Sequence, residues 1–272
     1  MIESLVINEI YLSLQGESTF AGLPCVFVRL TACDLRCSYC DTAYAFTEGK
    51  KMALGEVLSV VQRLAAPFHI GVHCETEGRA CGEAPQAARE ARALPGDATA
   101  STYSLPLVEL TGGEPLLQKA SLQLMKVLCD AGFTVLLETS GAHDISQVDP
   151  RVHCIMDLKC PSSGEVLRNL WENLKLLKHK DEIKFVIGTE QDYEWAKNQV
   201  SDHQLASVCP VLFSWVAPLT EAQQHESLKR VPSGQRPISR KELAERIIAD
   251  ALPVRFQLQM HKVIWPPDAR GV

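Results

Sequence analysis

Three cysteines with chemically suggestive spacing lie near the N-terminus, in the run CDLRCSYCDT. They are Cys33, Cys37 and Cys40, which gives the pattern CxxxCxxC. Iron–sulfur clusters are usually held by four cysteine thiolates, and this run provides one ligand fewer. A cluster held here would leave one iron atom open to a substrate or cofactor. The pattern therefore predicts a polynuclear metal site that takes part in chemistry rather than only storing electrons.

Two other interpretations of the run are a zinc site and ordinary core packing. A structural zinc ion takes four ligands, usually from two separated pairs, and no second CxxC occurs elsewhere in the chain to complete such a site. Free cysteines are often buried in protein cores. These three, however, are flanked by Asp34, Arg36 and Asp41, which is untypical of a buried apolar strand.

Composition excludes several classes of protein. The 272 residues, 46% of them apolar, are enough for one large core, so we expect a single domain over residues 1–272. The net charge of -6 and the scattered basic residues predict no nucleic-acid partner. The N-terminus lacks the pattern of a signal peptide, and no stretch approaches the roughly 20 apolar residues of a membrane span. We expect a cytoplasmic protein without a membrane partner.

Short apolar runs rich in β-forming residues alternate with segments of helical period. The predicted strands are residues 25–30, 106–110, 133–138, 152–158, 182–187, 207–215 and 254–260. Helices are predicted at 117–131, 165–178 and 190–201, and Ser239 with Glu242 forms a capping box ahead of a last helix. This alternation predicts an α/β fold in which βαβ units form a parallel sheet, as an open barrel or a doubly wound sheet.

One segment, residues 71–104, departs from this alternation. It is rich in Ala, Gly, Glu, Arg and Pro and contains few large apolar residues, which predicts a surface insertion. Cys74 and Cys81 lie in it beside His73 and could form an auxiliary metal site. Because no second pair is present to complete four-ligand zinc geometry, we expect them to be ordinary loop cysteines.

Polar runs follow three of the predicted strands. They are Thr111–Pro115, Glu138–Gly141 and Asp157–Ser162. Ligands of parallel sheets bind where the carboxyl ends of the strands meet, so these runs and the cysteine run should surround one shared mouth. Gly112 and Gly113 leave room for the backbone to approach a ligand closely.

With Tyr39 directly before Cys40, the cysteine run resembles the signature of radical S-adenosylmethionine enzymes. The resemblance implies that Cys33, Cys37 and Cys40 hold a 4Fe-4S cluster, whose open iron binds the amino and carboxylate groups of S-adenosylmethionine. An electron from the cluster then yields methionine and a 5′-deoxyadenosyl radical. The resemblance assigns contacts with this cofactor to Tyr39, Cys40, Asp41, Gly112, Gly113, Glu114, Ser140, Cys160, Pro161 and Ser162.

Further runs resemble the 7-carboxy-7-deazaguanine synthase family over most of the chain outside residues 71–104. They are SLQGES at 13–18, Arg29, Asp41-Thr42 and QMHK at 259–262. By resemblance, Thr42 binds Mg²⁺, and the substrate contacts are Leu14, Gln15, Gly16, Glu17, Arg29, Thr111 and His261. A glutamine and a carboxylate suit the amide and amino edge of a pterin, and arginine suits a substrate carboxylate. Because Mg²⁺ prefers several oxygen ligands, substrate oxygens would have to complete its shell.

The reaction implied is the ring contraction of 6-carboxy-5,6,7,8-tetrahydropterin to 7-carboxy-7-deazaguanine with release of ammonia, a lyase reaction of the queuosine pathway of tRNA modification. The radical takes and returns the hydrogen at C6, so no side chain is assigned as catalytic. The resemblance further implies an incomplete (βα)6-type TIM-like barrel, a homodimer, and an electron donor such as flavodoxin or ferredoxin. Ser214 is followed by Trp215 where the family often has Ser-Pro, so no cofactor contact is assigned to Ser214.

Two alternative functions remain open. A glycyl-radical-enzyme activase shares the cysteine run and a GGEP-like run but acts on a protein backbone. The SLQGE run, Arg29 and His261 favour a small-molecule substrate instead. The second alternative is a cluster-containing regulatory protein without this activity, against which the intact Thr42 and Glu114 argue.

Overall fold

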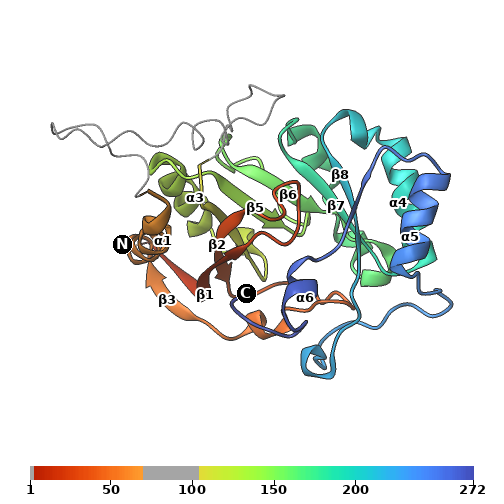
Figure 1. Cartoon of the computed structure of the whole chain (residues 1–272), viewed down its shortest axis with the longest axis horizontal. Coiled ribbons are helices and arrows are strands. Elements are labelled where there is room, and N and C mark those ends of the chain that lie inside the picture. The colour runs from red at the N-terminus through yellow and green to blue at the C-terminus, as the bar shows by residue number, and fades with distance from the viewer. Residues whose placement is uncertain (1–2, 70–103) are drawn as a thin grey trace, which may run out of the picture.

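The computed structural model of the chain describes residues 3–69 and 104–272 (Figure 1). In this part of the chain nine strands form one sheet, in the order β3-β1-β2-β4-β5-β6-β7-β8-β9. The strands are β1 Ser4–Leu14, β2 Pro24–Leu30, β3 Lys50–Ala53, β4 Leu107–Gly112, β5 Val135–Thr139, β6 His153–Asp157, β7 Glu182–Ile187, β8 Val211–Trp215 and β9 Arg255–Gln257.

The sheet is an open one with two kinds of pairing. From β2 through β4 to β9 every neighbouring pair is parallel, whereas β1 pairs with β2 and β3 in the antiparallel sense. The sheet does not close on itself, since β3 and β9 are its two edges. This arrangement confirms the α/β prediction and the incomplete TIM-like barrel.

The longer helices lie in two groups beside the sheet (Figure 1). They are α1 Leu54–His69, α3 Ala120–Asp130, α4 Glu190–Asp202 and α5 Arg240–Ala249, and a short helix, α6, spans His261–Ile264. α1 and α3 lie near the N-terminal strands, and α4 and α5 lie beyond β7 and β8. The capping box predicted at the start of α5 is present, with the Ser239 hydroxyl accepting from the Glu242 amide.

Alternation along the strands separates two layers of side chains. Ile183, Phe185 and Ile187 of β7 belong to the large core that packs against the helices. Successive strand residues point to opposite faces, so Lys184 between them faces the interior of the open barrel. A small apolar cluster fills part of that interior, and its buried members are Cys25, Phe27, Leu107, Leu136 and Ile155.

A layer of polar side chains lies on the carboxyl side of this cluster. Moving two residues along each strand from the apolar cluster leads to Arg29 in β2, Glu109 in β4, Glu138 in β5 and Asp157 in β6. Because the strands are parallel, these residues share one face and one end of the sheet. The strand pattern thus builds a polar chamber above an apolar plug.

The prediction of an α-helix at residues 165–178 is wrong. The segment instead forms two short 3₁₀ helices, Val166–Arg168 and Trp171–Leu176. Between them the Asn169 side chain bonds the Lys159 amide and carbonyl, and the Leu170 amide donates to the Gly141 carbonyl. These tertiary hydrogen bonds draw the backbone out of helical geometry despite its apolar period.

Among the strands and the longer helices, β1, β3 and α1 were not predicted from the sequence. β1 is mostly half-buried, so it lacks the compact apolar run of a central strand. α1 does carry a recognisable signal, because Val57, Val61 and Ala65 recur every four residues and are all buried. The last predicted strand is also too long, since it ends at Gln257 and His261 begins α6.

Two other sequence predictions concern the insertion at residues 71–104 and the absence of a membrane span. The insertion at 71–104, with Cys74 and Cys81, lies almost entirely outside the described residues, so its placement stays a prediction. Within residues 3–69 and 104–272, no helix has the length and apolarity needed to cross a membrane.

Candidate functional site

A cavity of about 520 Å³ opens at the carboxyl ends of the parallel strands. It brings together side chains from the cysteine run, the strand ends and the C-terminal segment. The predicted site residues that line it are Leu14, Gln15, Gly16, Glu17, Arg29, Cys33, Cys37, Tyr39, Cys40, Asp41, Thr42, Thr111, Gly112, Gly113, Ser140 and His261. Glu114, Cys160, Pro161 and Ser162 were also predicted for the site but do not line this cavity.

The three thiols of the cysteine run share one wall of the cavity. Burial raises the pKa of Cys33 to about 11 and of Cys37 to about 12, and it raises that of Cys40 as well. A metal must therefore displace these protons when it binds. Lys159 also lines the cavity, and its charge acts in the opposite direction on all three thiols.

The arrangement of the cysteine run suits a polynuclear cluster better than a single metal ion. No group of three or more His, Cys, Asp or Glu in the described residues is already arranged around a single metal ion. In a polynuclear cluster each thiolate binds a different iron atom, so the thiols need to line one space rather than converge on one point. Cys33, Cys37 and Cys40 meet that requirement, and the residues present fit a cluster.

Gly112 and Gly113, at the end of β4, pack against the backbone at the start of the cysteine run. A Cβ at residue 113 would lie 1.8 Å from the Ala32 carbonyl oxygen and 3.0 Å from the Cys33 amide nitrogen. The Gly113 amide donates to the Leu30 carbonyl at 3.0 Å, and the Glu114 amide donates to the Ala32 carbonyl at 2.7 Å. The absence of a side chain at Gly113 therefore permits the backbone contact that positions Cys33.

Replacing Gly113 with alanine should consequently disturb the cysteine run. The new methyl group would overlap backbone atoms that cannot rotate away, so we expect a lower Tm and a lower iron content after reconstitution. Both can be measured on the purified variant by thermal denaturation and iron analysis. Gly55 in α1 is a matched control, because a Cβ there meets no atom within 4 Å and alanine favours a helix by about 1 kcal/mol. Equal iron content in G113A and wild type would contradict this interpretation.

Glu114 acts inside the protein. Its carboxylate is fully buried and accepts from the Thr139 hydroxyl and from the Ser140 amide, the latter at 2.7 Å. It also accepts from the Leu116 amide at 3.0 Å. Glu114 thus ties the loop after β4 to the end of β5, where Ser140 reaches the cavity wall.

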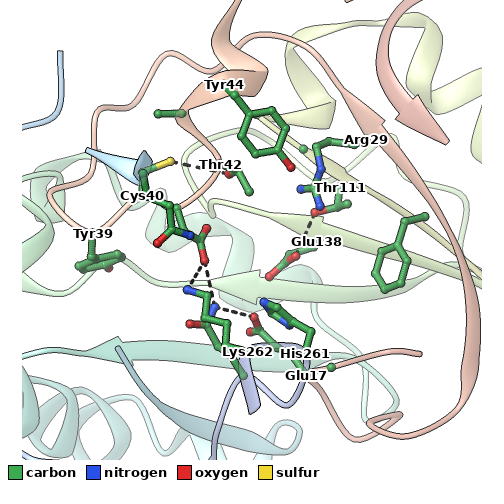
Figure 2. Close-up of a pocket in the computed structure, with 18 of the residues that line it drawn as sticks. Glu17, Arg29, Tyr39, Cys40, Thr42, Tyr44, Thr111, Glu138, His261 and Lys262 are labelled. Carbon is green, nitrogen blue, oxygen red and sulfur yellow. Dashed lines mark hydrogen bonds and ion pairs between the residues drawn. The ribbon is translucent and has the colours of Figure 1, made fainter. Parts of the chain in front are cut away.

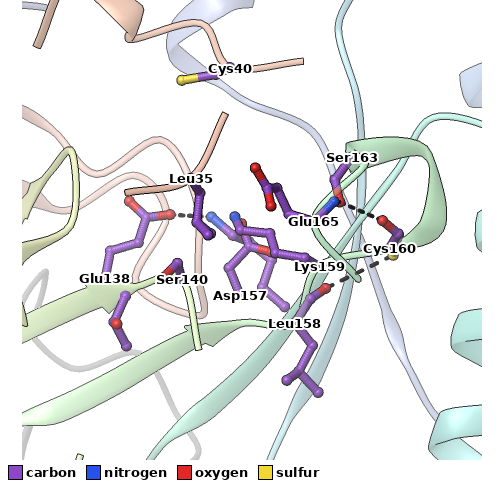
Figure 3. A network of polar contacts seen from close by, with 12 residues as sticks. Leu35, Cys40, Glu138, Ser140, Asp157, Leu158, Lys159, Cys160, Ser163 and Glu165 are labelled. Carbon is purple, nitrogen blue, oxygen red and sulfur yellow. Dashed lines mark hydrogen bonds and ion pairs between the residues drawn. The ribbon is translucent and has the colours of Figure 1, made fainter. Parts of the chain in front are cut away.

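The segment after β6 supports the cysteine run from outside the cavity. The Ser38 amide donates to the Ser163 carbonyl at 3.0 Å, and the Arg36 amide donates to the Glu165 carboxylate at 2.7 Å. Cys160 lies in this segment and is fully buried (Figure 3). Its predicted cofactor contact is not supported by a place at the cavity wall.

A second cavity of about 600 Å³ lies next to this segment and is lined by Tyr39 and Ser162. The hydroxyl oxygens of both residues are buried and have no hydrogen-bond partner in the part of the chain that the structure describes. Buried hydroxyls normally have partners. The Tyr39 and Ser162 hydroxyls are therefore exceptions within the described residues.

In the other half of the main cavity, Lys184 lies between two carboxylates. Its ammonium contacts Glu17 Oε2 at 2.9 Å and Glu138 Oε1, and the Thr111 hydroxyl donates to Glu138 Oε2 at 3.0 Å. Burial alone would raise the pKa of Glu17, but Lys184 and His261 outweigh it and lower the pKa to about 2. The pKa of Lys184 is raised well above its ordinary value, because Glu138 and Glu17 outweigh the effect of burial.

Segments from opposite ends of the chain form one wall of this half. A Cβ on Gly16 would lie 2.6 Å from His261 Nδ1, and the Met260 amide donates to the Gly16 carbonyl at 2.9 Å. Gln259 Nε2 donates to Glu17 at 3.0 Å. The sequence pairing of SLQGE with QMHK therefore corresponds to direct contact, and Figure 2 shows Glu17 next to His261.

Arg29 provides the cation on the opposite wall. Its Nε donates to Glu9 at 2.8 Å and its Nη2 to the Tyr11 hydroxyl at 2.9 Å. Burial lowers the pKa of Arg29, but Tyr11, Tyr44 and Glu9 outweigh burial and raise this pKa above its ordinary value. The guanidinium therefore stays charged. The labelled side chain of Arg29 lies across the space from Glu17 (Figure 2).

Two lining residues, Glu109 and Lys184, were not predicted from the sequence, whereas Asp157 and Lys159 were predicted as part of a run beside the mouth but were given no role. Lys159 and Asp157 pair at 2.8 Å. Lys184 was missed because a lysine inside EIKFVI suggests an exposed strand position. The alternation of Ile183, Lys184 and Phe185 was an available signal, because in a barrel the face opposite the helices points to the interior.

The chain is similar to known proteins over nearly its whole length. No protein-family model matches the chain. The 7-carboxy-7-deazaguanine synthase of Chlorobaculum tepidum is 39% identical over 271 residues, covering 98% of this chain and 97% of the relative. That of Koribacter versatilis is 39% identical over 273 residues, covering 98% and 99%.

A solved structure supports the fold. The crystal structure of QueE from Escherichia coli superposes with a TM-score of 0.58 at 20% identity and covers 95% of both chains. The similarity to the two relatives extends over nearly the whole of each chain. The chain therefore belongs to the 7-carboxy-7-deazaguanine synthase family.

Proposed function

We propose that the chain contracts the ring of 6-carboxy-5,6,7,8-tetrahydropterin to give 7-carboxy-7-deazaguanine and ammonia. The observation that carries the proposal is a single cavity with three thiols on one wall and a buried acid–lysine network in the other half. When bound, S-adenosylmethionine and a 4Fe-4S cluster supply the 5′-deoxyadenosyl radical. The protein's own side chains bind, orient and shield the reactants.

Cys33, Cys37 and Cys40 are the ligands of the proposed cluster. Gly113 keeps the start of their loop against the end of β4, and Ser38 bonds the segment after β6. The loop is thereby fixed on two sides. Such fixation suits a radical reaction, because a reactive species has to form at one defined place beside the substrate.

The other half of the cavity suits a carboxylated pterin. Arg29 is a permanent cation for the substrate carboxylate, and it is held by Glu9 and Tyr11 rather than left to move. Glu17 and Glu138 offer carboxylate oxygens to the N–H groups of the ring. His261 and Thr111 lie beside these two acids and complete the proposed set of polar contacts.

Mg²⁺ binding is proposed at Thr42, whose hydroxyl lies 3.8 Å from the Cys40 sulfur on the cavity wall. The adjacent Asp41 carboxylate is already paired with Lys262. Burial raises the pKa of Asp41, but Lys262 outweighs burial and lowers it, so Asp41 remains an anion. An Mg²⁺ ion here would need oxygen atoms from the substrate to fill its shell.

The remaining proposals concern the cellular setting. The product is proposed to enter queuosine biosynthesis and so tRNA modification, with an electron donor such as flavodoxin or ferredoxin. The chain is proposed to act as a homodimer in the cytoplasm. Similarity to 7-carboxy-7-deazaguanine synthases supports the pathway assignment.

The function can be tested with anaerobically reconstituted protein. With the tetrahydropterin, S-adenosylmethionine, Mg²⁺ and a reductant, we expect deazaguanine product by mass spectrometry and no net consumption of S-adenosylmethionine. Cleavage of S-adenosylmethionine without deazaguanine would favour another radical reaction, such as that of a glycyl-radical-enzyme activase. If neither deazaguanine product nor cleavage of S-adenosylmethionine is detected, the result would favour the regulatory alternative.

A further inference from the structure

Glu109 is a buried acid on the floor of the main cavity that has no role in the function proposed so far. It lies on β4 two residues before Thr111, so both side chains face the interior. Only 2% of the residue is exposed, although it lines the cavity. Burying a carboxyl group costs free energy unless hydrogen bonds compensate for the lost water contacts, so both oxygens of Glu109 require hydrogen-bond partners.

Within residues 3–69 and 104–272, the side chain that bonds the Glu109 carboxyl group is that of Gln15. Gln15 Nε2 donates to Glu109 Oε2, and Gln15 Oε1 accepts from the Glu17 amide at 2.9 Å. Both ends of the Gln15 amide are therefore occupied within the protein, and the residue is only 3% exposed. Gln15 is thus poorly placed to pair with a substrate bidentately, because its oxygen and one of its two N–H groups are already engaged.

The second oxygen of Glu109 is available instead. Oε1 accepts no hydrogen bond from a residue in the described ranges, and it is not among the fully buried atoms that lack a partner. The atom is therefore reachable from the cavity that Glu109 lines. An acceptor held in this way can be satisfied by a donor on a bound molecule.

The charges around Glu109 favour a ligand with several N–H donors. Glu17 and Glu138 share the buried ammonium of Lys184, and Glu109 contacts no cation in the described part of the chain. Burial and the nearby Glu138 raise the pKa of Glu109 well above its ordinary value, and an N–H donor on a ligand would lower this pKa again by stabilising the carboxylate. The floor has more acceptors than donors, whereas Arg29 contributes the cation on another wall.

We propose that Glu109 is a substrate-contact residue that accepts a hydrogen bond from the 2-amino group of the pterin, and that Gln15 is the positioning residue that holds it. This inference rests on the proposed function and refines it. The sequence resemblance assigns the contact with the amino edge of the pterin to Gln15, whereas the contact proposed here is made by Glu109 on β4. A pterin with its carboxylate at Arg29 has its amino edge at the other end of the bicycle.

The test compares two non-reactive ligands by calorimetry, using reconstituted protein with S-adenosylmethionine. 6-Carboxypterin carries the 2-amino group, and 6-carboxylumazine carries an oxygen there. Wild-type protein should prefer the pterin by about 10- to 100-fold, as expected for a hydrogen bond to an acidic group. E109Q should lose most of this preference, because an amide can turn its N–H₂ toward the lumazine oxygen.

Glu182 provides a matched control. It is also an acid with 2% exposure on an interior strand, its pKa is also raised by burial, and it bonds Thr19 without lining the cavity. E182Q should keep the wild-type preference. Q15M should lose part of it, and this variant serves as the test if E109Q does not fold.

The outcomes separate this inference from the proposed function. Wild-type protein that binds neither ligand would contradict the pterin substrate itself. A wild-type preference for the pterin that is unchanged in E109Q, or in Q15M where E109Q is unfolded, would overturn the role of Glu109 and leave the proposed function intact.

Discussion

Cys37→Ala should abolish cluster binding and all ring-contraction activity. Cys37 is one of three thiols that line the cavity, and the cluster would retain only two protein ligands without it. Methyl groups cannot bind iron, and no other cysteine among the described residues lines this cavity. Reconstituted C37A should lack the brown absorbance and the iron content of wild type, and product should be undetectable.

C209A is the matched control for this substitution. Cys209 is a buried thiol in the large core next to the helices and does not line the cavity. It should retain full iron content, so that only loss of a ligand, and not loss of any buried thiol, explains the result. Full cluster content in C37A would show that the ligands have been assigned wrongly.

Lys184→Met should destabilise the protein by about 3 kcal/mol, the lower end of the range for a buried ion pair, because it leaves two partly buried carboxylates without their cation. Here two carboxylates, Glu17 and Glu138, would lose the ammonium they share. Urea denaturation at neutral pH measures the change in the free energy of unfolding. Substrate binding should also weaken, since both acids would be free to turn or to take up protons.

The pH dependence of the free energy of unfolding is a second measurable consequence of the contact between Lys184 and Glu17. The native pKa of Glu17 is about 2 and its ordinary value is 4.5. A lowered native pKa stabilises the fold above the ordinary value and loses that effect as the pH falls toward the native one. Wild-type stability should therefore fall between about pH 4.5 and 2 partly through Glu17, and K184M should lack much of this contribution.

Two further variants make the interpretation specific. Lys197 pairs with Asp250 nearer the surface, and such pairs contribute about 1 kcal/mol or less, so K197M should change stability little. K184M/E138Q should recover part of the lost stability, because one uncompensated carboxylate is removed. A K184M protein as stable as K197M would contradict the role given to the buried ammonium.

The sequence predicted most of the parallel sheet because its strands are buried on both faces and stand out as compact apolar runs. It failed at β1, which is half-buried, and at residues 165–178, where Asn169 bonds Lys159 across a loop. Tertiary hydrogen bonds of this kind leave no periodic signal. The helical period of residues 165–178 was real, but the backbone follows its long-range partners.

For the site, motif spacing predicted which segments meet but not what each side chain does there. The cysteine run, Gly113 and His261 all lie at the cavity, as expected from their motifs. Spacing could not reveal that Gln15 is fully engaged by Glu109 and Glu17, or that Glu114 bonds Thr139 and Ser140 inside the protein. Those distinctions depend on contacts between strands that are far apart in sequence.

The contact between Gly16 and the Met260–His261 segment has a consequence for the order of assembly in the cell. These residues are hydrogen-bonded neighbours although they lie near opposite ends of the chain. During translation the wall that includes Glu17 and His261 can form only after residue 261 has left the ribosome, whereas the β2–β4–β5 sheet can pair much earlier. The substrate half of the cavity is therefore completed after the β2–β4–β5 sheet, and we expect a nascent chain not to bind pterin before residue 261 has emerged.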